Sequence, residues 1–64
     1  MILNGEERKI NSRISVSDLL KQENYDFRRT AVLVNGTVIP RARYDSAAVS
    51  DEDIVEIVGF VGGG

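Results

Sequence analysis

Two Asn-Gly dipeptides constrain this chain more than any other feature. Asn4-Gly5 follows the apolar run 1–3, and Asn35-Gly36 separates the β-rich segment 31–34 from 37–39. Both residue types tolerate the positive φ angles of tight hairpin turns. The sequence therefore predicts two β-hairpins. The first would be completed by a strand at 8–10, with its turn type left open by Glu6 and Glu7.

A short helix is predicted between the hairpins. Ser15 is a suitable N-cap, and Asp18 stands three residues later, as in a capping box. Apolar residues then recur on one side at helical spacing, namely Val16, Leu19 and Leu20. The helix should end near Asn24, and it is short enough that packing rather than propensity must hold it.

The remainder of the chain alternates loops and strands. Residues 25–29 form a predicted loop whose Tyr25 and Phe27 would cover an end of the core, and Pro40 should end the strand 37–39 because it lacks an amide donor. Residues 41–49 form a predicted irregular connection carrying Tyr44, and 50–53 a polar turn. The segment 54–58 is the last clear strand, continuing towards Phe60.

This order of elements predicts an α+β fold. A hairpin, a helix and further strands can form a mixed sheet of four to five strands with one main helix packed on one face. If the first and last strands are neighbours, they run parallel, with the helix in a right-handed crossover. That is the β-grasp (ubiquitin-like) arrangement. We expect one domain over residues 1–60 and a flexible glycine tail over 61–64.

Composition excludes several classes of function. The 64 residues contain neither cysteine nor histidine, which removes thiol nucleophiles, thiolate metal ligands and imidazole catalysis. We expect no metal site and no cofactor bound by this chain. A net charge of −2 provides no basic field for nucleic acid, and no apolar run is long enough for a membrane span. The N-terminus lacks a secretory signal pattern, so a cytoplasmic location is expected.

The chain finishes in Gly62-Gly63-Gly64. Three glycines disfavour regular structure because glycine loses the most backbone entropy on ordering. At a terminus they form a strip without side chains that could enter a narrow channel on another protein. A frayed end or a cloning remnant explains the composition equally well.

Three segments of the sequence resemble the ThiS family of sulfur carriers in thiamin biosynthesis. The end of the chain from Asp53 to Gly64 is similar to the end of these carriers, and 34–41 (Val-Asn-Gly-Thr-Val-Ile-Pro-Arg) is similar to their second hairpin. The helix start 15–20 (Ser-Val-Ser-Asp-Leu-Leu) also fits. The similarity spans the whole chain, and the departure is a third glycine, Gly62, before the terminal pair.

The resemblance implies a carrier cycle rather than an enzyme. A ThiF-like, E1-like adenylating enzyme would use ATP to activate the Gly64 carboxylate. Sulfur from a cysteine desulfurase system would then give a thiocarboxylate, and thiazole synthase would take the sulfur into thiazole. Gly64 would be the covalent site, with Gly62 and Gly63 inserted into the partner. The absence of cysteine agrees with attachment at the terminal carboxyl.

A carrier also needs a recognition surface. Leu33, Val38 and Phe60 are candidates for apolar contact on the sheet face that the helix leaves open, although each could simply complete the core. Arg41 and Arg43, or Arg28 and Arg29, could contact acidic patches on partners, although solvated loop charge explains them as well.

Three other functions fit the same sequence. The chain could carry sulfur as the small molybdopterin synthase subunit does, although that family usually has a longer chain. It could be a ubiquitin-like protein modifier joined to lysines through Gly64. It could also be a non-catalytic β-grasp interaction module with an inert tail, in which case removing Gly63 and Gly64 would leave its activity unchanged.

Overall fold

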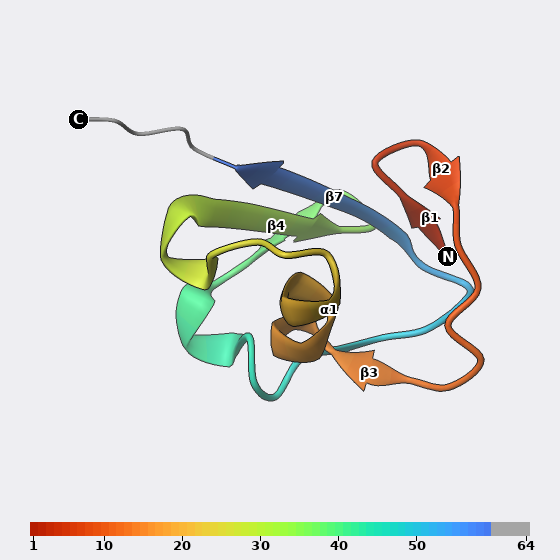
Figure 1. The fold of residues 1–64 in the computed structure, drawn as a ribbon, viewed down its shortest axis with the longest axis horizontal. Helices are drawn as coiled ribbons and strands as arrows, with labels where there is room; N and C mark the ends of the chain where they lie inside the picture. Colours follow the sequence, from red (N-terminus) through yellow and green to blue (C-terminus); the bar gives the residue numbers. More distant parts are fainter. Residues whose placement is uncertain (60–64) are drawn as a thin grey trace.

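The computed structural model describes residues 1–59, which form a mixed sheet covered on one face by a helix (Figure 1). Five strands lie in the order β2-β1-β7-β4-β5, with bounds β1 Ile2–Leu3, β2 Glu6–Glu7, β4 Thr30–Val34, β5 Thr37–Ile39 and β7 Ile54–Gly59. The helix is α1 (Val16–Gln22). Strands β1 and β7 are parallel neighbours, and the other pairs are antiparallel. The predicted β-grasp arrangement is confirmed.

The first hairpin is tighter than predicted. Asn4 and Gly5 have φ angles of 50° and 85°, so both central residues are left-handed, as a two-residue type I′ turn requires. This turn places Glu6 directly opposite Leu3. The returning strand is therefore β2 at Glu6–Glu7, and the predicted strand at 8–10 was wrong because the short turn leaves no residues to spare.

The second hairpin has the same turn. Asn35 and Gly36 have φ angles of 51° and 84°, and β4 and β5 pair from Val34 and Thr37 outward. Pro40 follows β5 and is the N-cap residue of the short 3₁₀ helix η2 (Arg41–Arg43). The predicted end of this edge strand at proline is confirmed.

Helix α1 is capped at both ends. The Asp18 amide donates to the Ser15 hydroxyl over 3.0 Å, which confirms the predicted N-cap. At the other end Asn24 has a φ of 62°, and the Tyr25 amide donates to the Leu20 carbonyl over 2.9 Å. This is a Schellman ending, which satisfies carbonyls that the last turn leaves free. No helix within residues 1–59 has the length and apolar character needed to cross a membrane.

Two short strands and both 3₁₀ helices, η1 and η2, were not predicted. Strand β3 (Ile14–Ser15) leads into α1 and pairs antiparallel with β6 (Ala48–Val49). Strand β6 lies inside the segment 41–49, which was expected to be irregular. Helix η1 (Phe27–Arg29) lies in the predicted loop after α1. The β3–β6 pair ties the start of the helix to the connection that leads into β7.

The core lies between α1 and the sheet. Its buried residues form one cluster: Met1, Leu3, Val16, Leu19, Leu20, Val32, Tyr44, Val49, Val55 and Ile57. The Tyr44 hydroxyl donates to the Thr30 carbonyl over 3.3 Å inside this cluster, which satisfies a polar group that burial would otherwise penalise. Tyr25 packs against the cluster as predicted, whereas Phe27 is 50% exposed and does not.

Two turn asparagines fasten β7. The Asn4 side-chain carbonyl accepts the Ile57 amide over 2.7 Å. The Asn35 side-chain carbonyl accepts the Ile54 amide over 2.9 Å, and its NH₂ group donates to the Asp53 carboxylate over 3.0 Å. Each asparagine therefore makes a turn and holds a distant strand.

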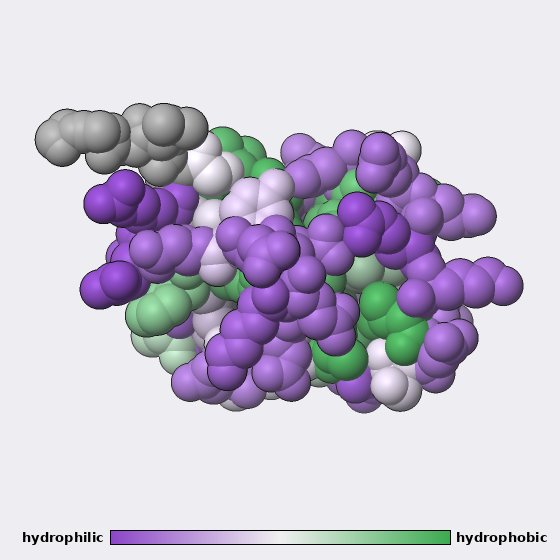
Figure 2. All heavy atoms as spheres, viewed as in Figure 1, coloured by the Kyte–Doolittle hydropathy of each residue, from purple (hydrophilic) through white to green (hydrophobic). Residues whose placement is uncertain are grey.

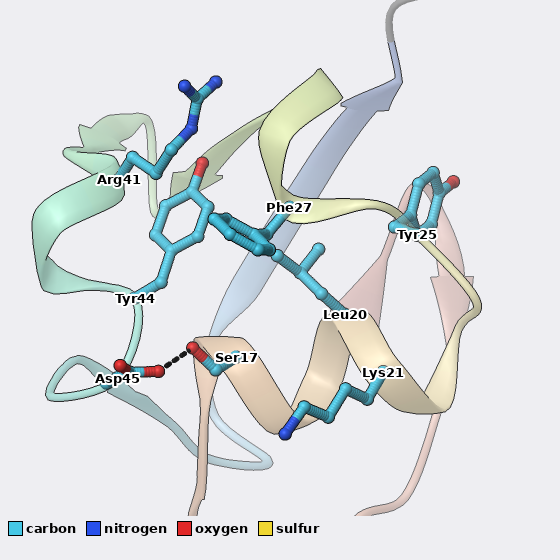
Figure 3. Close-up of a pocket in the computed structure, with 8 residues that line it drawn as sticks. All are labelled: Ser17, Leu20, Lys21, Tyr25, Phe27, Arg41, Tyr44 and Asp45. Carbon is cyan, nitrogen blue, oxygen red and sulfur yellow. Dashed lines mark hydrogen bonds between the residues drawn. The ribbon is translucent and has the colours of Figure 1, made fainter.

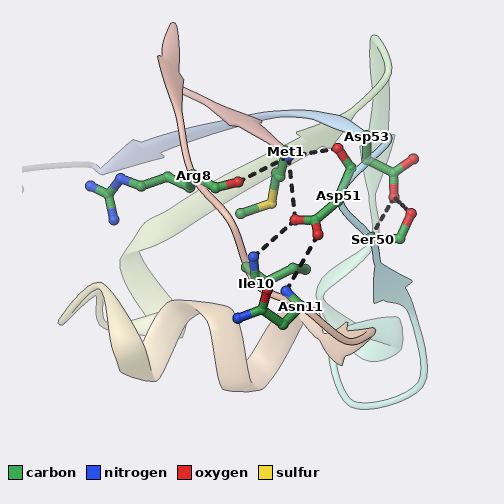
Figure 4. A network of polar contacts seen from close by, with 7 residues as sticks. All are labelled: Met1, Arg8, Ile10, Asn11, Ser50, Asp51 and Asp53. Carbon is green, nitrogen blue, oxygen red and sulfur yellow. Dashed lines mark hydrogen bonds and ion pairs between the residues drawn. The ribbon is translucent and has the colours of Figure 1, made fainter.

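A polar network joins the first strand to the turn before β7 (Figure 4). The Met1 ammonium donates to the backbone carbonyls of Arg8 and Asp51, over 3.0 and 2.6 Å. The Asp51 carboxylate accepts the amides of Ile10 and Asn11. These amides, that of Ile10 first, together with the ammonium hold the pKa of Asp51 below its ordinary value.

Replacing Asn4 tests its two roles separately. Asn4→Ala should lower the free energy of unfolding by about 2 kcal/mol, because alanine resists left-handed backbone and the bond to Ile57 is lost. Asn4→Gly should cost only about 1 kcal/mol, because glycine accepts the turn geometry. Urea unfolding of both variants measures the difference, and equal losses would contradict the assignment of strain to this turn.

Acidification tests the network around Asp51. Because its pKa is lower in the folded chain than in the unfolded chain, its stabilising effect is complete above about pH 4, the unfolded value. That effect is lost as the pH falls through the folded value. Asp51→Asn should therefore lower the thermal midpoint at pH 7 and flatten its fall towards pH 3. The exposed neighbour variant Glu52→Gln is the control, and identical pH profiles for the two variants would refute this role for Asp51.

Candidate functional site

The predicted reactive tail lies outside the described residues. Phe60, Gly62, Gly63 and Gly64 all fall within 60–64, so their roles and the boundary at 60/61 stay predictions. The structure does fix where this segment starts. Gly59 is the last residue of β7, the middle strand of the five-stranded sheet.

Strand β7 separates its side chains strictly between two faces. Val55 and Ile57 are buried on the side of α1, while Ile54, Glu56 and Val58 are exposed on the other side. Side chains alternate across a strand with a period of two. Because one helix covers one face only, the second face of the sheet is open.

Two of the three predicted recognition residues meet on this open face. Leu33 on β4 and Val38 on β5 are direct cross-strand partners, so their side chains lie side by side. Leu33 is half-buried, and Val38 is 62% exposed. Val38 is therefore too exposed to be a core residue.

The sequence reasoning missed the contribution of β7. Ile54 and Val58 are 53% and 47% exposed, and the registers place them beside Ile2 and Ala31. The alternation along 54–58 was the signal that could have found them. We name the whole set the open-face cluster: Ile2, Ala31, Leu33, Val38, Ile54 and Val58. Glu56, opposite Leu33, lies on this face as a charged member.

Figure 2, viewed in the same direction as Figure 1, shows mostly hydrophilic side chains with small apolar areas between them. A shallow hollow of about 290 Å³ lies between α1, η1 and η2. Leu20, Phe27 and Tyr44 line it together with the charged Lys21 and Arg41 (Figure 3).

Two polar groups that line this hollow bind each other. The Ser17 hydroxyl donates a hydrogen bond to the Asp45 carboxylate beside the start of α1. Of the predicted loop arginines, Arg28 is paired with Asp26 at 3.4 Å. No group of three or more acidic, histidine or cysteine side chains within residues 1–59 is placed to hold a metal ion.

Comparisons with known proteins agree with this architecture. The sequence model of the ThiS family matches residues 1–64. The sulfur carrier protein ThiS of Bacillus subtilis (strain 168) is 35% identical over 63 residues, which are 97% of this chain and 96% of that protein. The crystal structure of the thiamine biosynthesis protein ThiS from Geobacter metallireducens superposes with a TM-score of 0.82 at 30% identity, covering 98% of this chain and 96% of that one.

A further relative is much longer. A thiazole synthase of Paramagnetospirillum magneticum (strain ATCC 700264 / AMB-1) is 41% identical over all 64 residues, yet this chain spans only 20% of its length. The family match covers the whole chain, and the Bacillus relative covers nearly all of it. The chain therefore belongs to the ThiS family.

Proposed function

We propose that this chain carries sulfur as a thiocarboxylate on Gly64. Membership of the ThiS family, with a relative named as a sulfur carrier protein, confirms the predicted role in carrying sulfur for thiamin biosynthesis. The observation that carries the proposal is the position of the glycines. Gly62, Gly63 and Gly64 follow β7 with only Phe60 and Val61 between, and the chain contains no cysteine that could hold sulfur instead.

The proposed chemistry needs a partner at each step. A Gly64 carboxylate oxygen attacks the α-phosphorus of ATP on a ThiF-like enzyme, and pyrophosphate leaves. The resulting acyl adenylate is a better electrophile than the carboxylate. A thiol reductant first releases the persulfide sulfur of a cysteine desulfurase system as hydrosulfide. The hydrosulfide attacks the carbonyl carbon of the acyl adenylate, AMP leaves, and loss of a proton gives the thiocarboxylate. In this scheme ATP binds to the activating enzyme, and the chain is a cosubstrate rather than a catalyst.

We propose thiazole synthase as the acceptor of the sulfur. A relative with that name contains a region 41% identical to this chain. A carrier domain joined to an enzyme in one protein is expected to work with that enzyme when the two are separate chains. Gly62 and Gly63 would enter the active site of each partner, since a strip without side chains fits a narrow channel.

The open-face cluster is the proposed docking surface for these partners. Its most exposed members lie on two strands that flank β4, namely Val38 on β5 and Ile54 and Val58 on β7. Contiguous apolar surface of this kind is typical of interaction sites. Because the cluster and Gly59 belong to the same sheet, docking through this face would fix where residues 60–64 enter the partner.

Intact mass measures the carrier chemistry directly. Incubation with ATP, the host's adenylating enzyme and sulfide should raise the mass by the difference between one sulfur and one oxygen, mapped to Gly64 and absent without ATP. A chain lacking Gly63 and Gly64 should keep its unfolding midpoint, because two glycines add no side chain to the core, but should show no mass change. An unmodified full chain beside a demonstrably active enzyme would refute the proposal.

A pair of matched variants tests the docking surface. Val38→Lys should weaken binding to the adenylating enzyme at least tenfold, because an unpaired charge would be desolvated in the interface. Its unfolding free energy should change by less than about 1 kcal/mol, since lysine is tolerated on an edge strand. Phe27→Lys, at a similarly exposed apolar residue on η1, should leave binding unchanged. Titration calorimetry measures both, and equal affinities would contradict docking through the open face.

A further inference from the structure

The two neighbours of β7 differ in length. Strand β4 accompanies β7 to its end, where Thr30 lies opposite Gly59. Strand β1 pairs with only two residues of β7, Ile54 and Val55, before the chain turns away at Asn4. The second half of β7 therefore has a partner strand on one edge only.

The hydrogen bonds of β7 show which groups face the shortened neighbour. On this edge the Asp53 carbonyl accepts the Ile2 amide over 3.0 Å, and the Val55 carbonyl accepts the Asn4 amide over 2.9 Å. The Ile57 amide then donates to the Asn4 side chain over 2.7 Å. Odd-numbered residues of β7 thus point their backbone groups towards β1, and even-numbered residues point theirs towards β4.

The next groups on this edge are the Ile57 carbonyl and the Gly59 amide. Neither has a hydrogen-bond partner among residues 1–59, and Gly59 is exposed. The Tyr25 ring does not fill the gap. It lies where a Gly59 side chain would point, 3.4 Å from an added Cβ, and in a strand that direction is the helix-covered face rather than the edge.

We propose that an extended segment of the enzyme that adenylates Gly64 pairs with this free edge of β7. The inference rests on the proposed carrier function. Unpaired strand edges are templates for strand addition, and this one continues directly into residues 60–64. Any enzyme that holds Gly64 in its active site must accommodate the residues just before it. A partner strand bonded to Ile57 and Gly59 would align that segment with the channel it enters.

Two isomeric variants at Gly59 isolate the backbone bond. Gly59→sarcosine places a methyl group on the nitrogen and removes the donor, whereas Gly59→Ala places the same methyl group on Cα and keeps it. The alanine Cβ would meet Tyr25 at an ordinary contact distance. A full chain of 64 residues is accessible to chemical synthesis. Neither variant should alter the unfolding midpoint much, since this amide bonds nothing in residues 1–59.

Binding to the adenylating enzyme should separate the two variants. We expect the Kd of the sarcosine variant to be about threefold to tenfold higher than that of the alanine variant, which is the effect of one lost hydrogen bond. In the complex of the natural chain, hydrogen exchange of the Gly59 amide should slow at least tenfold. Equal affinities together with unchanged exchange would overturn the proposal.

Adenylation of the natural chain separates failure of the edge pairing from failure of the carrier function. If the natural chain is adenylated normally and the sarcosine variant binds equally well, the edge has no such role and the carrier function stands. If the natural chain is not adenylated by the active enzyme, both ideas fail. Concentration-dependent dimerisation that protects Gly59 without the enzyme would assign the edge to a second copy and would likewise overturn the proposal.

Discussion

The hydrogen bonds that hold β7 in the middle of the sheet are the interactions on which the rest of the structure depends. The strand comes last in the described chain, yet it joins the first hairpin through β1 and the second through β4. Two turn asparagines add side-chain bonds to its Ile54 and Ile57 amides. Without β7 the two hairpins would share no strand, and an isolated two-stranded hairpin is at best marginally stable in water.

The size of the domain explains why chemistry would be left to partners. A chain this small buries only about 60% of its unfolded surface, and its single core lies between one helix and one sheet face. Few apolar side chains remain to build a second layer, so the other face stays open. A core of this size does not provide enough side chains to enclose a reaction chamber. In the proposed carrier function, the Gly64 carboxylate would instead react in an active site that another protein provides.

Local signals in the sequence were sufficient for most of the fold. The Asn-Gly turns, the Ser15 cap and the Pro40 strand end all act through their own backbone geometry, and each lies where it was predicted. The β3–β6 pair was missed because two-residue strands have no detectable period and are held by a distant partner. Likewise, nothing local reveals that Asn4 bonds to Ile57, 53 residues away. The open face was predicted through Leu33 and Val38. Its β7 members Ile54 and Val58 were missed, although the alternation along 54–58 indicated them.

The alternation of β7 also determines how a partner can approach. Even-numbered residues such as Val58 turn their side chains to the open face and their backbone groups to β4. Odd-numbered residues, including Gly59, face the helix side with their Cα substituents, and their backbone groups point to the edge that β1 covers only in part. Adjacent residues at the end of β7 therefore present different kinds of contact, an apolar side chain and a free amide. A partner that engages both must approach the corner between face and edge, and residues 60–64 begin at that corner.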